Sequence, residues 1–366
     1  MDSPLSQELS TAIDAARQAA LISRTALSQA ESVASSANRL VKDDLSPVTI
    51  ADFAIQALLT SRLGAAFPQY GFIGEESADD LRENPALLER VLSILKLCTS
   101  SSEEEEWTAS SLCAKIDSCT SITELSPTSG RVWIFDPIDG TKSFIKNQQY
   151  AINIALVENS RQVLSVVACP LLDMNASYPV TDADLDPTGR GSILFAVRNH
   201  GSYIIPLINN NDNHAPDQAA PPPRRLPPAD PSTLKSVTCF NSLDSGIDPI
   251  HSLISSKLSI PFPGCDLLGW VPRWAALAMG LGNTTIWVYK SRDRAAKIWD
   301  HAGAMLLYEE VGGKITDVHG KEIDLSCGRK LKNNFGFVAA PREAHDLVLK
   351  AVQDTLREQG KEGLLV

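Results

Sequence analysis

The sequence predicts an α+β protein in which helices and strands pack in layers. Helix and strand candidates are mixed along the chain without strict βαβ alternation, which favours this class over a doubly wound sheet. A segment rich in Asn, Asp and Pro, residues 209–231, interrupts the chain and marks a boundary loop. The chain has 366 residues, enough for two lobes, which we place at residues 1–208 and 232–366.

The first lobe is expected to begin with two helices and to continue as a sheet. Apolar residues recur at helical spacing from about Ser6 to Leu40, and a second helix follows Pro47. The short apolar run at residues 70–73 predicts a strand, as does the run at residues 131–135, where we expect Pro137 to break the strand. Further strand candidates are residues 151–157, 163–168, 193–197 and 202–207.

Residues 98–130 interrupt the first lobe. They are polar and include four consecutive glutamates at 103–106, so we expect a mobile excursion. The second lobe is expected to contain a strand at 236–240, a helix at 273–281, a strand at 285–289, a helix from Trp299-Asp300 and a hairpin-like segment from residue 314.

The composition limits the class of protein. With 33 Lys and Arg against 44 Asp and Glu, the net charge is −11, which argues against binding to nucleic acid. The seven cysteines show no C-x-x-C spacing, and no apolar run is long enough to span a bilayer. The N-terminus is acidic and helical in pattern, unlike a signal or transit peptide. We therefore expect a cytoplasmic protein that binds no membrane.

Several carboxylates stand at the ends of predicted elements. Asp136 and Asp139 flank Pro137 after a buried strand, Glu75 follows another strand, and Asp300 begins a helix. Carboxylates that gather at one point repel each other unless cations lie among them. An all-oxygen set suits Mg²⁺, with Mn²⁺ as a second possibility, and does not suit zinc.

The chemistry that such a site predicts is metal-assisted hydrolysis of a phosphate ester. Divalent cations bind the phosphate, lower the pKa of a water molecule and neutralise the leaving group. Asp52 and Thr141 are the candidates to orient that water, and the backbone N–H groups of Gly140 and Thr141 can receive a phosphate oxygen.

These segments together resemble the lithium-sensitive, magnesium-dependent phosphatases related to inositol monophosphatase, and in particular their 3′(2′),5′-bisphosphate nucleotidase branch. The order and spacing of the motifs match over most of the chain. The matching segments are Lys42-Asp43-Asp44-Leu45-Ser46-Pro47-Val48-Thr49-Ile50-Ala51-Asp52, Gly74-Glu75-Glu76-Ser77, Asp136-Pro137-Ile138-Asp139-Gly140-Thr141-Lys142-Ser143-Phe144, Lys297-Ile298-Trp299-Asp300-His301-Ala302-Gly303, Gly312-Gly313-Lys314-Ile315-Thr316-Asp317 and Gly328-Arg329.

The resemblance implies the family's five-layered αβαβα sandwich, known from inositol monophosphatases and sugar phosphatases. It also implies two or three Mg²⁺ ions and hydrolysis of adenosine 3′,5′-bisphosphate to AMP and phosphate. The implied metal ligands are Glu75, Asp136, Asp139, Asp300 and the carbonyl of Ile138, while Asp52 and Thr141 would activate water. The residues expected to bind substrate are Gly140, Thr141, Arg273, Lys290, Lys297 and Asp300.

The substrate-recognition segments depart from that branch. Residues 240–245 lack the histidines of its His-Ser-Ser-His-like segment, and residues 269–274 replace its Asp-Ser-Gln-x-Lys-Tyr with two tryptophans and an arginine. A phosphatase for an inositol phosphate, a sugar phosphate or a specialised metabolite therefore stays open, as does a non-catalytic phosphometabolite sensor. We expect Trp270, Trp274 and Trp287 in the core, and leave His301 open between structural and substrate roles.

Overall fold

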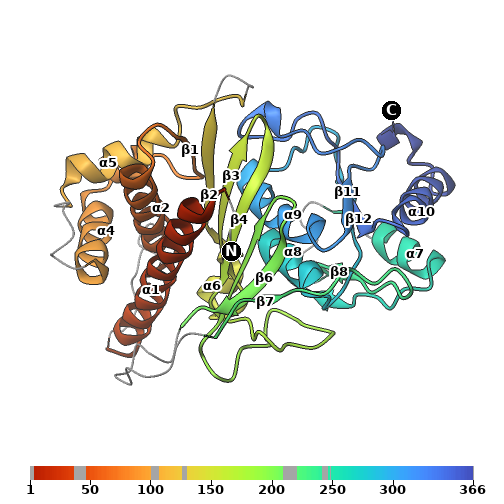
Figure 1. The fold of residues 1–366 in the computed structure, drawn as a ribbon, viewed down its shortest axis with the longest axis horizontal. Helices are drawn as coiled ribbons and strands as arrows, with labels where there is room; N and C mark the ends of the chain where they lie inside the picture. The colour runs from red at the N-terminus through yellow and green to blue at the C-terminus, as the bar shows by residue number, and fades with distance from the viewer. Residues whose placement is uncertain are drawn as a thin grey trace.

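The computed structural model describes residues 4–36, 47–99, 107–125, 130–208, 221–240, 246–247 and 249–365. Within these ranges the chain forms five layers in the order helix, sheet, helix, sheet, helix (Figure 1). This arrangement confirms the expected α+β sandwich. Residues 42–46 of the first motif and residues 241–245 lie outside the described residues.

The larger sheet has seven strands among the described residues, in chain order from β1 to β7. β1 runs parallel to β2, and every other neighbouring pair is antiparallel. The strands are β1 (Gly71–Ile73), β2 (Arg131–Asp139), β3 (Ala151–Glu158), β4 (Arg161–Cys169), β5 (Ser192–Val197), β6 (Gly201–Pro206) and β7 (Arg224–Arg225). The expected break at Pro137 is wrong, because β2 continues to Asp139 with a shift in its register against β3 between Asp136 and Asp139.

β2 shows how the sheet separates two cores. Its side chains alternate between the faces, as they must in a pleated strand. Trp133 and Phe135 belong to the cluster formed with α1 (Ser6–Ser36) and α2 (Pro47–Ala66), whereas Val132 and Ile134 belong to the cluster on the other face.

Residues 98–130 contain a packed helix, which the expectation of a mobile excursion did not include. α5 (Ala109–Ser118) begins with a capping box in which the Thr108 hydroxyl accepts from the Ser111 backbone and the Ser111 hydroxyl accepts from the Thr108 backbone. The helix buries Leu112 and Ile116 and packs against α2. Two further helices, α3 (Asp79–Glu83) and α4 (Pro85–Cys98), precede it in the chain.

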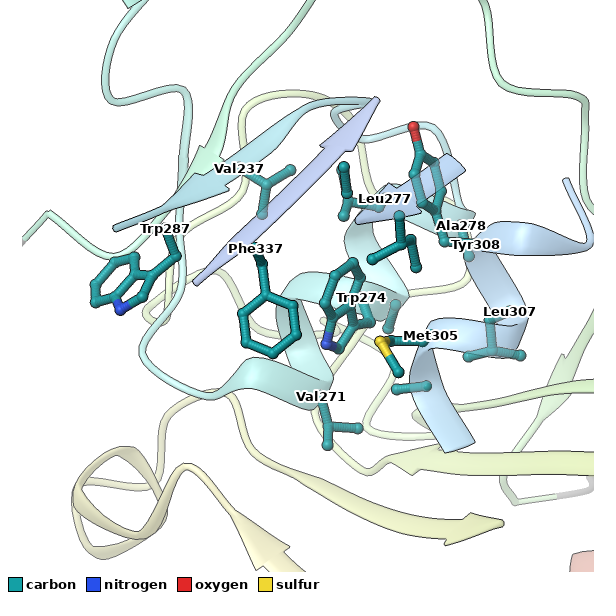
Figure 2. Close-up of a cluster of buried hydrophobic side chains, with 14 of the residues drawn as sticks. Val237, Val271, Trp274, Leu277, Ala278, Trp287, Met305, Leu307, Tyr308 and Phe337 are labelled. Atoms are coloured by element: carbon teal, nitrogen blue, oxygen red, sulfur yellow. The ribbon is translucent and has the colours of Figure 1, made fainter. Parts of the chain in front are cut away.

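Helices α8 (Trp270–Ala278) and α9 (Ala302–Glu309) form the middle layer between the seven-stranded sheet and a three-stranded sheet. Figure 2 shows part of the core that they build, with Trp274 beside Phe337. α8 begins three residues before the expected start at Arg273. The remaining elements are α6 (Thr141–Ile145), β8 (Val237–Thr238), α7 (Ile250–Lys257), β9 (Cys265–Asp266), β10 (Thr285–Trp287), η3 (Ile298–Asp300), β11 (Gly313–Thr316), η4 (Leu325–Cys327), β12 (Phe337–Pro341), α10 (His345–Glu358) and η5 (Glu362–Leu365).

The three-stranded sheet has the strand order β10-β12-β11, and both pairs are antiparallel, while β8 and β9 form a separate parallel pair. β11 lies where the hairpin-like segment was expected from residue 314, but its antiparallel partner β12 follows only after η4, so the two strands do not form a tight hairpin. α7 and α10 cover the outer face, with α10 packed directly on β12. Among the helices of the described ranges, none combines the length and the apolar character that crossing a membrane requires.

Candidate active site

Glu75 and Asp136 come together because β1 and β2 are parallel neighbours. Ile73 of β1 lies opposite Ile134 of β2, so the residues two positions later leave the same edge of the sheet. Asp136 is buried, with 2% of its surface exposed. Burial raises its pKa well above the usual value, and the negative charge of Glu75 raises it further.

Asp139 lies at the end of β2, beyond the register shift. The backbone N–H groups of Val271 and Gly140 both donate hydrogen bonds to its carboxylate. Burial raises the pKa of Asp139 to about 7, although these hydrogen bonds and the positive charge of Arg273 lower it. The N–H of Gly140, expected to meet a phosphate oxygen, is thus directed at Asp139.

Asp300 reaches the same region from the last third of the chain. It ends η3, which is held against the large sheet because the Asn153 side chain of β3 donates to the carbonyl oxygen of Trp299 at 2.6 Å. α9 must also approach closely, since a Cβ added to Gly303 would lie 2.3 Å from Oδ1 of Asn153. Asp300 and Asp136 share a side-chain hydrogen bond.

Asp52 and Thr141 lie on neighbouring helices. Asp52 is a buried residue of α2, and Thr141 is the exposed first residue of α6, which packs against α2. Burial raises the pKa of Asp52 well above its usual range, and the charges of Glu76 and Glu75 raise it further. Asp52 therefore belongs to the same electrostatic cluster as the acids at the sheet edge.

The acids of the cluster destabilise one another's charged forms. Burial is the largest cause of the raised pKa of Asp300, followed by the charges of Asp139 and Glu75. Burial likewise raises the pKa of Glu76 to about 7, with a further rise from Glu75. Glu75 is an exposed residue by surface area, yet partial desolvation by the surrounding protein raises its pKa, while the positive charges of Lys297 and Arg329 lower it. Because these acids raise one another's pKa, either bound protons or bound cations must neutralise the cluster as a whole.

The cluster fits a hard divalent cation in its chemistry. All of its donors are oxygens, as Mg²⁺ requires. Oδ1 of Asp136 and Oδ1 of Asp52 are buried and have no hydrogen-bond partner within the described part of the chain, so both are available to a cation. No three His, Cys, Asp or Glu side chains of the described residues already stand in an arrangement that could hold a metal.

A cavity of about 520 Å³ opens beside Glu75 and Glu76. Its wall includes Lys297, which is exposed and lies 5.1 Å from the centroid of the Trp299 ring. The cavity places a positive charge next to the acids at the edge of the sheet. Lys290, also expected to bind substrate, is exposed and follows the buried Tyr289.

Arg273 has a structural role that the sequence did not reveal. It is 3% exposed, and its Nε and Nη2 donate to the carbonyl oxygens of Leu267 and Leu268 at 2.9 and 2.7 Å. Its guanidinium carbon lies 4.1 Å from the centroid of the Trp270 ring and 4.8 Å from that of Trp287. Two of its donor groups are thus already occupied by the protein.

His301 also has a structural role. Its Nδ1 accepts a hydrogen bond from Nε1 of Trp274 at 3.1 Å, and its ring stacks on Phe337 at 4.2 Å. Burial lowers its pKa well below the usual value, so the ring is neutral. Trp274 and Trp287 are buried in the same cluster, as expected from the sequence (Figure 2).

Some supporting residues were missed by the sequence reasoning. Asn153 holds the segment before Asp300, and Val271 donates to Asp139 through its backbone. Arg329 donates to the carbonyl oxygen of Glu75 at 3.1 Å. Asn153 carries a usable signal, because it is an amide within an otherwise apolar strand, whereas the backbone of Val271 carries none.

Comparisons with known proteins agree with this architecture. The model of the inositol monophosphatase family matches residues 5–357. The chain is 34% identical to a 3′(2′),5′-bisphosphate nucleotidase of Schizosaccharomyces pombe, over 94% of each chain. It is 30% identical to one of Emericella nidulans, over 86% of this chain and 90% of that one.

Solved structures share the fold at lower identity. An inositol monophosphatase from Thermotoga maritima aligns with a TM-score of 0.54 and 17% identity, over 96% of this chain and 99% of that one. Inositol monophosphatase-II from Staphylococcus aureus aligns with a TM-score of 0.55 and 16% identity, over 98% of each chain. The family match covers nearly the whole chain, and the protein therefore belongs to the inositol monophosphatase family.

Proposed function

We propose that the protein is a Mg²⁺-dependent phosphomonoesterase that hydrolyses a 3′,5′-bisphosphate nucleotide, with adenosine 3′,5′-bisphosphate as the reference substrate and AMP and phosphate as products. One observation supports metal-assisted hydrolysis. Acids from four separate segments raise one another's pKa, and two of their buried oxygens have no partner within the described residues. Such a group suits divalent cations, and the family is metal-dependent.

The substrate class rests on relatives. Proteins 34% and 30% identical to this chain bear the name 3′(2′),5′-bisphosphate nucleotidase, and a related solved structure contains 2′AMP. We extend that substrate class to this chain. Cytoplasmic location and inhibition by Li⁺ are further parts of the proposal.

Each acid has a proposed role. Glu75, Asp136, Asp139, Asp300 and the Ile138 carbonyl would hold two or three Mg²⁺ ions, with Mn²⁺ as a substitute. Bound Mg²⁺ would neutralise these acids, bind phosphate oxygens and lower the pKa of a water molecule. Asp52 would accept the proton of the attacking water, with the Thr141 hydroxyl oriented between them. Lys297 and Lys290 would supply positive charge to the substrate.

Phosphate release tests the activity. The full chain is assayed with adenosine 3′,5′-bisphosphate, an inositol phosphate and a sugar phosphate at equal Mg²⁺, with and without EDTA. The proposal expects Mg²⁺-dependent release with the highest kcat/KM for the bisphosphate nucleotide. A nucleotide no better than the sugar phosphate would refute the substrate assignment.

A second candidate substrate follows from Trp270. Its ring is half-buried, lies over Arg273 and is one residue from Val271, whose N–H meets Asp139. The ring packs on Trp274, Trp287 and Phe337 and does not supply the small polar side chain that the nucleotidase branch has in this segment, which favours a phosphate ester other than a nucleotide. A higher kcat/KM for the sugar or inositol phosphate in the same assay would support this candidate.

Asp136→Asn tests whether hydrolysis depends on the carboxylate of Asp136. The variant removes one charge from a buried position while keeping its size, so the fold should persist and hydrolysis should fall by at least a hundredfold. A phosphometabolite sensor predicts ligand binding without turnover in the wild type. Turnover unchanged by Asp136→Asn would remove the proposed metal role of Asp136.

A further inference from the structure

Arg329 contacts two segments of the chain, and each of them carries an acid of the cluster. Its Nη1 donates to the carbonyl oxygen of Cys119 at 3.2 Å, and its Nη2 donates to that of Glu75 at 3.1 Å. The guanidinium carbon also lies 4.7 Å from the centroid of the Trp299 ring. Because Trp299 precedes Asp300, one side chain touches the segments of two proposed metal ligands.

The backbone around Arg329 is bound to the segment before Asp300. We call residues 326–331 the strap. Ile298 donates its N–H to the carbonyl oxygen of Arg329 at 3.1 Å, and Leu331 donates to that of Ala296 at 3.0 Å. The strap and residues 296–298 thus form a short antiparallel ladder, which includes the bridge between Lys297 and Lys330.

The other end of the strap is bound beside the end of β1. Leu125 donates its N–H to the carbonyl oxygen of Ser326 at 3.0 Å. Gly328 has φ of +74°, and a Cβ there would lie 1.7 Å from the carbonyl oxygen of Thr123, so the two backbones are in direct contact. The Cys119 carbonyl that accepts from Arg329 also accepts from the N–H of Gly74, which precedes Glu75.

We infer that Arg329 is a positioning residue that sets the separation of Glu75 and Asp300 and thereby the affinity of the site for Mg²⁺. The inference rests on the proposed function, because it takes these two acids as ligands. Arg329 acts through its hydrogen bonds to backbone carbonyls, and it does not itself contact the cation. Residues that orient metal ligands typically contribute a factor of about 10 to 100 to metal affinity.

The positive charge of Arg329, taken alone, predicts the opposite change in Mg²⁺ affinity when the residue is removed. A guanidinium near Mg²⁺ repels it, so charge alone predicts that removal of Arg329 strengthens Mg²⁺ binding. Positioning predicts that removal weakens it. Lys332 provides a matched control, because its cation lines the same cavity and makes no hydrogen bond to the Glu75 segment in the described structure.

Calorimetric titration of the full, metal-free chain with Mg²⁺, without substrate, tests the inference. We expect Arg329→Gln to raise the Kd for Mg²⁺ by about tenfold or more. Arg329→Lys, which keeps the charge but not the two-pronged geometry, should give an intermediate Kd. Lys332→Gln should leave the Kd unchanged or slightly lower. Far-UV circular dichroism in EDTA checks that each variant is folded.

Distinct results identify which idea fails. A wild type that binds no Mg²⁺ would refute the proposed function itself. The positioning role alone would be overturned if the wild type binds Mg²⁺ and the Kd of Arg329→Gln is lower than, or within twofold of, the Kd of the wild type. If Arg329→Gln does not fold, Arg329→Lys decides, because a Kd equal to that of the wild type in this variant would also overturn the role.

Discussion

Asp139→Asn should stabilise the metal-free protein at high pH. Burial raises the pKa of Asp139 from its usual 3.8 to about 7. A raised pKa in the folded state favours folding while the group is protonated, and this contribution is lost as the pH rises towards 7. An asparagine has no charge to lose, so the variant should gain stability relative to the wild type over that range.

The size of the effect follows from the pKa. Each pKa unit corresponds to about 1.4 kcal/mol, so the two pH units between 5 and 7 correspond to about 3 kcal/mol. The asparagine keeps one oxygen to accept from Val271 and Gly140, which leaves one N–H less well paired and costs about 1 kcal/mol at every pH. Comparison of two pH values cancels this constant cost.

Urea denaturation in EDTA at pH 5 and pH 8 measures the effect. The difference in unfolding free energy, variant minus wild type, should be about 2 to 3 kcal/mol larger at pH 8. Asp186→Asn is a matched control, because hydrogen bonds from Thr188 and Gly191 lower the pKa of Asp186 despite the opposing effect of burial. Asp186 is ionised at both pH values in the folded and the unfolded state, so its variant-minus-wild-type difference should not change between them. A difference for Asp139→Asn that is independent of pH would refute the reasoning.

Three further predictions concern packing and metal. Gly303→Ala should cost about 2 to 4 kcal/mol, measured by urea denaturation, because its Cβ would lie 2.3 Å from Oδ1 of Asn153. Trp274→Phe should cost about 1 kcal/mol more than Trp133→Phe in the same assay, because the former breaks the hydrogen bond to His301 whereas the Trp133 N–H is unpaired in the described residues. Mg²⁺ at 100 times its Kd should stabilise the wild type by about 2.7 kcal/mol, with no gain in Asp136→Asn.

Features encoded in short stretches of sequence could be predicted. The apolar run of β2 and the acids around Pro137 are consecutive, so the strand and its functional end were both visible. The strand was expected to end at Pro137, because proline lacks the N–H that donates to a neighbouring strand in a sheet. The register shift between Asp136 and Asp139 accommodates it, and no local pattern marks that shift.

Contacts between distant residues could not be predicted from local pattern. Val271 lies 132 residues from Asp139, and Arg329 lies 254 residues from Glu75, so only the packed structure brings them together. The burial of Arg273 was hidden for a similar reason, because a cation in sequence reads as a surface or ligand-binding group. α5 was not predicted because the Ser, Thr and Glu residues just before it have the composition of a solvated loop, and the two-residue capping box alone is a weak helix signal.

The two-sided burial of β2 constrains how this protein can change over evolutionary time. An inserted or deleted residue between Arg131 and Phe135 would exchange the faces of Trp133 and Ile134, and would rotate Asp136 away from its neighbours. Lineages that acquire new substrates should therefore tolerate length variation in peripheral loops but keep the spacing of this strand unchanged. The packing of both cores and the position of the acids at the site thus depend on the same nine-residue strand.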